Sequence, residues 1–192
     1  MNTDFLDFFK RFNFLSLEDL RLLYSMVRIK KVSAGDRIIN EGEVFFFGVF
    51  IIKGLLRVYY IMPNGEDRTL HFAYDGMHLG SPESIFEDMP ALENVEALEP
   101  SLLLYLDTRK FDKLARNKPA LLRLKNSGLE ESVVEMAKRV KFLSIYEAEE
   151  RYLYLCANNP ELVQRVPQKH LASYLGVTPS SLSRIKARIA AG

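Results

Sequence analysis

The chain has 192 residues, 48% of them hydrophobic, and a formal net charge of +1, which allows a sizeable buried core in one large or two small domains. Its single cysteine excludes an intramolecular disulfide and a cluster ligated by several thiols of one chain. No apolar run is long enough to cross a bilayer and no N-terminal export signal is present, so we expect a cytoplasmic protein without a membrane partner.

The N-terminal part of the sequence changes from a helix signal to strand signals. Ser16 and Asp19 are spaced to cap a short helix whose leucines face a core. Short β-rich runs separated by glycine turns follow, at residues 44–52, 55–61, 69–72 and 102–106. Many short strands with frequent glycine turns predict a small barrel or sandwich.

Two helices are predicted after the strands. Asp107 or Thr108 caps a helix that runs to Leu114, and Pro119 suits the first turn of a long helix that runs to about residue 143. The long helix carries a stripe of side chains spaced alternately four and three residues apart, the repeat of a coiled-coil seam. This seam consists of Leu122, Asn126, Leu129, Val133, Met136, Val140 and Leu143.

The seam favours a parallel homodimer. Asn126 at an a-type position resembles the polar residue that fixes register in two-stranded coiled coils. The alternative is that the stripe packs on the strands, and Gly128 weakens the helix by about 1 kcal/mol relative to alanine. Beyond the seam, Ser144 and Glu147 form a predicted capping box that begins a helix through Cys156, which places a hinge near Ser144.

The C-terminal residues 166–189 contain two short helical patterns separated by Gly-Val-Thr, the arrangement of a helix-turn-helix. Pro167 suits the first position of the first helix, Gly176 suits the turn, and Thr178 caps a second helix that begins at Pro179. In the second helix the apolar residues share one face. The opposite face carries Ser180, Arg184 and Ala187, flanked by Ser181, Ser183 and Arg188.

The charge of this segment supports DNA as a partner. No acidic residue follows Glu161, whereas five basic residues do: Arg165, Lys169, Arg184, Lys186 and Arg188. Serine approaches base edges or phosphates without bulk, and arginine donates two parallel hydrogen bonds to guanine. A solvated basic face on an ordinary helical hairpin is the alternative, but charge and periodicity together favour DNA binding.

The order of these features resembles the Crp/Fnr transcription regulators over nearly the whole chain. The matching pieces are residues 15–20, Ala34-Gly35-Asp36, Glu41-Gly42-Glu43, Ile52-Lys53-Gly54, Leu106-Asp107-Thr108 and the helix-turn-helix. The resemblance implies an α+β fold: an N-terminal antiparallel β-roll like a cyclic nucleotide-binding jelly roll, a long dimerisation helix and a C-terminal winged-helix-like helix-turn-helix. It also implies a bacterial homodimer that binds an inverted repeat in double-stranded DNA, with RNA polymerase as a further partner.

Three parts follow from this resemblance: a β-roll sensor domain at residues 1–118, a dimerisation helix at 119–143 and a DNA-binding domain at 144–192. Arg184 matches the family's base-reading arginine, whereas Ser180 stands where the family has an acidic residue, so the preferred DNA sequence should differ. The segment 158–166 is too short for a long β-wing. The expected DNA contacts are Lys169, Thr178, Ser180, Ser181, Ser183, Arg184 and Arg188.

The roll departs from the cyclic-nucleotide members of the family. Those members hold ribose with a Gly-Glu pair and phosphate with an arginine, but here Gly80 is followed by Ser81, and no lysine or arginine occurs between Asp75 and Thr108. The resemblance also places Met136 where the family contacts adenine. We therefore expect a different, neutral or apolar, effector or none. The candidate pocket residues are Arg57, Arg68, Gly80, Ser81, Glu83, Glu93 and Met136.

Two other classes of function compete with DNA binding. An enzyme would use His71 and His78 with Asp75 and Glu83, but the spacing of the histidines matches no recognised metal site, and nothing further supports a haem held by the same pair. A protein-binding module is the other alternative, and the basic, acid-free C-terminal segment argues against it. We expect no catalytic residue, no metal site and no cofactor.

Overall fold

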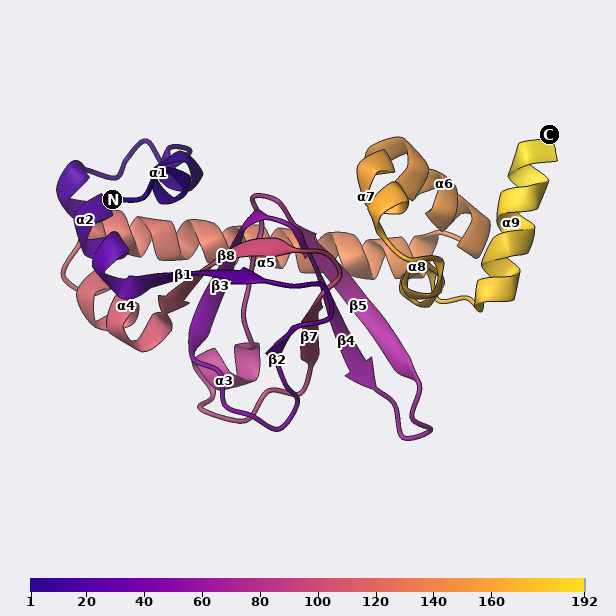
Figure 1. Cartoon of the computed structure of the whole chain (residues 1–192), viewed down its shortest axis with the longest axis horizontal. Helices are drawn as coiled ribbons and strands as arrows, with labels where there is room; N and C mark the ends of the chain where they lie inside the picture. The colour runs from indigo at the N-terminus through magenta and orange to yellow at the C-terminus, as the bar shows by residue number, and fades with distance from the viewer. Residues whose placement is uncertain (192) are drawn as a thin grey trace. The chain divides into compact units, whose positions relative to one another are not determined.

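The computed structural model describes residues 1–191, which form two compact units (Figure 1). One unit is Met1–Val58 with Phe72–Ser132, and it contains most of the strands. The other is Tyr59–His71 with the residues from Val133 onward, and it contains the C-terminal helices. No helix among the described residues is both long and apolar enough to span a membrane.

In the described part of the chain, eight strands form two four-stranded sheets, in the orders β1-β8-β3-β6 and β2-β7-β4-β5. β8 pairs antiparallel with β1 and with β3, as an antiparallel roll requires. The four predicted strand runs are confirmed as β3, β4, β5 and β8, although residues 44–46 lie outside β3. β1 and the short β2, β6 and β7 have no counterpart in the prediction. The strands are β1 Val27–Val32, β2 Arg37–Ile39, β3 Phe47–Lys53, β4 Leu55–Ile61, β5 Asp67–Tyr74, β6 His78–Leu79, β7 Asn94–Ala97 and β8 Ser101–Asp107.

The two sheets share an apolar core, to which the alternating strand residues Val49, Ile51, Leu56 and Leu103 contribute fully buried side chains. Burial of this apolar surface is the main force that holds the roll together. The turn between β3 and β4 needs glycine, because Gly54 has φ 130° and a Cβ there would lie 2.0 Å from the Ser101 hydroxyl oxygen.

Four short helices and the first part of a long one complete this unit: α1 Thr3–Phe9, α2 Leu17–Met26, α3 Pro82–Phe86, α4 Thr108–Ala115 and α5 Pro119–Ile145. The predicted cap of α2 is confirmed, since the Asp19 N–H donates to the Ser16 hydroxyl at 3.1 Å and the Ser16 N–H donates to the Asp19 carboxylate at 3.0 Å. α1 has no counterpart in the prediction, and its buried phenylalanines pack with residues of α2, β8, α4 and α5 in a second apolar core.

The helices of the other unit follow α5 in chain order: α6 Ala148–Asn158, α7 Pro160–Arg165, α8 Gln168–Leu175 and α9 Pro179–Ala191. The predicted α+β fold class is confirmed. No strand occurs from residue 148 to 191, so the helix-turn-helix has no wing within that range, and α7 lies in the segment 158–166, which is too short for a long wing.

Two sequence predictions about helix ends are wrong. Ser144 lies inside α5 and does not begin a new helix, because the break comes at Glu147, whose N–H donates to the Glu150 carboxylate at 2.8 Å. Pro167 is the N-cap of α8 and not its first residue. Its extended ψ of 138° turns its carbonyl toward the N–H groups of the following turn, and the His170 and Leu171 amides donate to it at 3.0 Å.

Candidate nucleic-acid interface

The turn between α8 and α9 is fixed by local hydrogen bonds. Gly176 adopts the left-handed conformation with φ 73°, and the Val177 N–H donates to the Ala172 carbonyl at 3.0 Å, which closes the end of α8. The Ser181 N–H then donates to the Thr178 hydroxyl at 3.2 Å, which caps the start of α9. The predicted Gly176 turn and Thr178 cap are therefore confirmed.

The two helices pack through one apolar face each. Leu171 and Leu175 of α8 and Leu182 and Ile185 of α9 are buried, as their helical spacing predicted. The opposite side of α9 is solvent-exposed, and we call its exposed residues Ser180, Ser183, Arg184, Ala187 and Arg188 the reading face. The packing therefore presents the predicted polar side chains on one continuous surface.

The predicted contact residues differ in their local partners. The hydroxyls of Ser180 and Ser181 lie 3.0 and 2.9 Å from that of Thr178, which gathers three hydroxyls at the start of α9. Arg188 forms an ion pair with Glu149 of α6. Arg184 makes no hydrogen bond or ion pair with any residue from 1 to 191, so its guanidinium is available to a ligand.

One residue of this surface is absent from the sequence prediction. The Gln168 side-chain amide, at the start of α8, donates to the Ser183 hydroxyl at 2.7 Å and links the beginning of α8 to the reading face. Lys169 is exposed beside it. Exposed positions near helix starts are signals of phosphate contact, and Gln168 could have been found by that criterion.

α8 forms hydrogen bonds with two other elements of its unit, the β4–β5 hairpin and α5. The Thr69 N–H of the β4–β5 hairpin donates to the Ser173 hydroxyl at 2.9 Å. From α5, the Arg139 guanidinium donates to the Tyr174 carbonyl at 2.8 Å and stacks on the Tyr174 ring at 3.8 Å. These contacts fix the helix that supports the reading face.

The seam on α5 is exposed along its whole length. Val133 and Val140 are each 64% exposed, whereas Leu121, Leu124 and Phe142, which lie off the seam, are buried. Leu122, Asn126 and Leu129, which belong to the unit with most of the strands, are therefore not packed on those strands. An apolar stripe of this length without a cover in the single chain is typical of a helix that pairs with another copy.

The candidate effector residues fall into two sets. Ser81 and Glu93 are buried in the unit that contains the roll, and the Ser81 hydroxyl donates to the Glu83 carboxylate at 3.2 Å. Arg57, 1% exposed in the same unit, forms an ion pair with Glu96 at 3.0 Å. Arg68 and Met136 belong to the other unit and are exposed.

Gly80 lies beside the first set and leaves little space. A Cβ at this position would come within 2.6 Å of the Ile85 Cδ1 atom. Burial raises the pKa of the Glu93 carboxyl, and the nearby Glu83 adds to that increase. The part of the candidate effector site formed by Ser81, Glu83 and Glu93 is therefore acidic.

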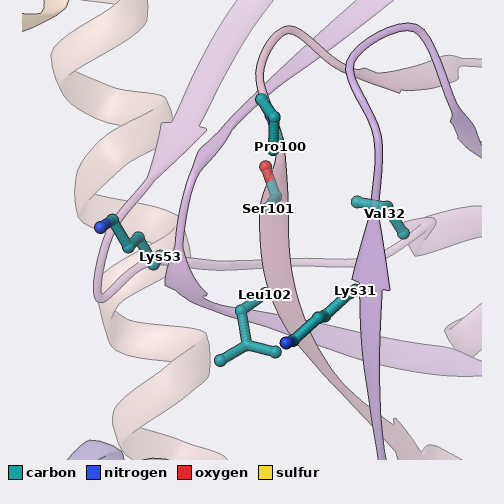
Figure 2. Close-up of a pocket in the computed structure, with 6 residues that line it drawn as sticks. All are labelled: Lys31, Val32, Lys53, Pro100, Ser101 and Leu102. Carbon is teal, nitrogen blue, oxygen red and sulfur yellow. The ribbon is translucent and has the colours of Figure 1, made fainter.

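An unpredicted hollow of about 260 Å³ lies on the surface of the first sheet. Figure 2 shows Lys31 of β1 and Lys53 of β3 on opposite sides of Ser101 and Leu102 of β8. Val32 and Pro100 complete its lining. The hollow contains none of the predicted effector residues.

The two histidines considered for an enzyme differ in their surroundings. Burial lowers the pKa of the His71 imidazole to about 4, which makes it a weak base near neutral pH. The His78 Nε2 atom lies 3.1 Å from the Gly128 carbonyl oxygen and 3.2 Å from the Ser132 hydroxyl oxygen, so α5 already engages it. Among residues 1–191, no group of three or more His, Cys, Asp or Glu side chains is arranged to hold a metal ion.

Comparison with known proteins identifies the fold. Residues 29–118 match the cyclic nucleotide-binding domain family. FixK2 from Bradyrhizobium japonicum superposes with a TM-score of 0.73 at 15% identity, over 86% of this chain and 85% of that chain. The catabolite activator protein of Thermus thermophilus has a TM-score of 0.55 at 21% identity, over 92% of this chain and 84% of that one. The chain has the Crp/Fnr fold.

A further Crp/Fnr structure is CLP of Xanthomonas campestris, a c-di-GMP-responsive global regulator, with a TM-score of 0.71 at 14% identity over 89% of each chain. No curated protein is significantly similar to the chain in sequence. The Crp/Fnr resemblance drawn from the sequence motifs is confirmed. The DNA contacts, the seam pairing and the effector pocket stay predictions.

Proposed function

We propose that this protein is a homodimeric, sequence-specific DNA-binding transcription regulator of the Crp/Fnr type, working in the cytoplasm with RNA polymerase as a partner. The observation that carries the proposal is the reading face of α9. Arg184 projects from it without a partner among the described residues, on a helix whose position is fixed by buried contacts with α8. An exposed, well-positioned arginine suits bidentate recognition of guanine in the major groove.

The surroundings of the reading face suit the DNA backbone. Gln168 and Lys169 lie at the start of α8, and the three neighbouring hydroxyls of Thr178, Ser180 and Ser181 lie at the start of α9. Unpaired N–H groups at helix starts favour anions, and hydroxyl, amide and ammonium groups are common phosphate donors. We infer that these residues set the orientation of α9 and that Ser180, Ser183, Arg184 and Arg188 face the bases.

The exposed seam supports a two-fold dimer through α5. Pairing two copies of the seam covers apolar side chains that are otherwise in water, and Asn126 sets the register. A two-fold dimer places two copies of α9 in successive major grooves. The operator is then an inverted repeat with half-sites about 34 Å apart.

Selection from random double-stranded DNA by the full-length protein tests this function. The expected result is an enriched inverted repeat, bound with an affinity that falls steeply as salt rises, because phosphate contacts release counterions. Equal affinity for selected and scrambled duplexes would contradict sequence-specific binding. Absence of DNA binding even at low salt would contradict DNA binding altogether and favour the protein-binding alternative.

A further inference from the structure

The roll contains a buried carboxylate without a partner. Glu93 is 4% exposed, and neither of its carboxylate oxygens accepts a hydrogen bond from any residue between 1 and 191. Buried polar groups in folded proteins are nearly always hydrogen-bonded, and an unpaired buried carboxylate is especially costly. This exception needs a physical explanation, and a missing ligand is one.

The side chains beside Glu93 offer more acceptors than donors. Ser81 is fully buried, and its hydroxyl hydrogen is already donated to the Glu83 carboxylate at 3.2 Å. Burial raises the pKa of the Glu93 carboxyl, and repulsion by the nearby Glu83 raises it further. Three oxygen-bearing side chains therefore meet with one shared hydroxyl proton between them.

No cation of this segment balances the charge. The chain has no lysine or arginine between Asp75 and Thr108. Arg57, on β4, has its guanidinium in an ion pair with Glu96 of β7. An anionic ligand at Glu93 would meet two carboxylates, whereas a cationic ligand would supply the missing charge and the missing donors.

We propose that Ser81, Glu83 and Glu93 bind a small molecule that carries a primary ammonium group. An ammonium group has three N–H donors and no acceptor, which matches three acceptor side chains. Glu93 ends the segment between α3 and β7, which has no regular secondary structure. The proposal rests on the proposed function only in naming this ligand as the effector of the regulator.

The test is calorimetry and thermal unfolding of the full-length protein with 1,4-diaminobutane and n-butylammonium. Saturable binding of either, with a rise in Tm, is the expected result. Butanol has the chain without the charge, and tetramethylammonium has the charge without the N–H donors, so both are expected not to bind. Calcium and magnesium chloride test whether a metal ion, and not an ammonium group, fits the site.

Two variants link binding to the site. Glu93→Gln and Ser81→Ala are expected to weaken diamine binding by about tenfold or more, the loss for a charge-assisted hydrogen bond. Glu87→Gln makes the same change on an exposed residue nearby and is expected to bind normally. No saturable ammonium binding, equal binding of tetramethylammonium, binding of metal ions alone, or unchanged binding by Glu93→Gln would each overturn the proposal.

The outcome for DNA is measured separately. Specific DNA binding that diamine does not change would support the proposed regulator and contradict the diamine as its effector. Diamine binding at Glu93 in a protein that binds no DNA would support the ligand site and contradict the proposed function. The failures of the two proposals are therefore distinguishable.

Discussion

The guanidinium of Arg139 on α5 donates a hydrogen bond of 2.8 Å to the carbonyl of Tyr174 and stacks on the ring of the same residue. Tyr174 lies near the end of α8, the first helix of the helix-turn-helix. Arg139 lies between Met136 and Val140 of the seam in sequence. One side chain thus connects the helix proposed to dimerise with the helix that supports the reading face.

Replacing Arg139 tests this connection. Arg139→Met keeps much of the side-chain volume but removes the donor, and we expect it to lower the free energy of unfolding by about 1–3 kcal/mol. Hydrogen exchange at the end of α8 should become faster, and DNA affinity should fall. Lys138→Met is the control, because Lys138 is exposed and pairs with Glu135 of its own helix. Unchanged exchange in α8 of Arg139→Met would show that the contact does not position that helix.

The seam predicts the oligomeric state. Val133→Asp with Val140→Asp places charges on two side chains that are each 64% exposed in the single chain, and we expect light scattering to show a monomer. Val134→Asp makes the same change on a neighbour that is 50% exposed and off the seam, and it should leave the dimer intact. A monomeric wild type at micromolar concentration, or a dimer that survives the double change, would exclude this seam.

Cyclic AMP and cyclic GMP are not expected to regulate the protein. The segment expected to hold phosphate contains the buried carboxylate of Glu93 and no lysine or arginine. A carboxylate about 4 Å from a phosphate repels it by roughly 4 kcal/mol at an effective dielectric near 20. That is about half of the binding free energy of a micromolar site. Calorimetry with each nucleotide should show no saturable binding, and micromolar binding would reveal a cation acting at this site.

Glu93 also predicts an unusual dependence of stability on pH. Burial raises its pKa in the folded state, so the folded state binds more protons than the unfolded state at pH values between the two pKa values. The free energy of unfolding therefore falls as pH rises through this window, and the cost is fully present above the folded pKa.

Glu93→Gln removes that ionisation, and at neutral pH the variant should be more stable than the wild type by about 1–3 kcal/mol. The gain should shrink as pH falls toward the ordinary pKa of glutamate. Urea unfolding at a series of pH values measures it, with Glu87→Gln as the exposed control. A variant that is less stable than the wild type at neutral pH would mean that Glu93 has a favourable partner in the folded protein.

Local signals predicted most of the fold and the reading face. The turn at Gly176, the cap at Thr178 and the seam depend on neighbouring residues or on helical periodicity, and sequence spacing reports both. Ser144 shows the limit of such signals. The spacing of Ser144 and Glu147 fits a capping box, but the capping box of the structure is formed by Glu147 and Glu150.

Contacts between distant residues were not predictable in the same way. The pairs Thr69–Ser173 and Arg139–Tyr174 join segments whose sequences carry no matching pattern. The unpaired state of Glu93 likewise depends on which groups the fold brings near it, although the excess of acidic residues in its segment is visible in the sequence. Sequence patterns thus predicted the positions of the exposed face of α9 and of the seam on α5. The contacts that support these helices depend on tertiary packing.

The central claim is that Arg184 reads a base. The most direct measurement compares Arg184→Ala with the wild type on the selected operator and on all single-base variants of it. We expect a loss of about 1–3 kcal/mol and a relaxed preference at one base pair of each half-site.

Two matched variants accompany that measurement. Lys169→Ala should weaken binding to all sequences alike and reduce the salt dependence, and Arg116→Ala, an exposed arginine of the other unit, should change neither. Unchanged affinity and unchanged base preference for Arg184→Ala on such a site would contradict the account.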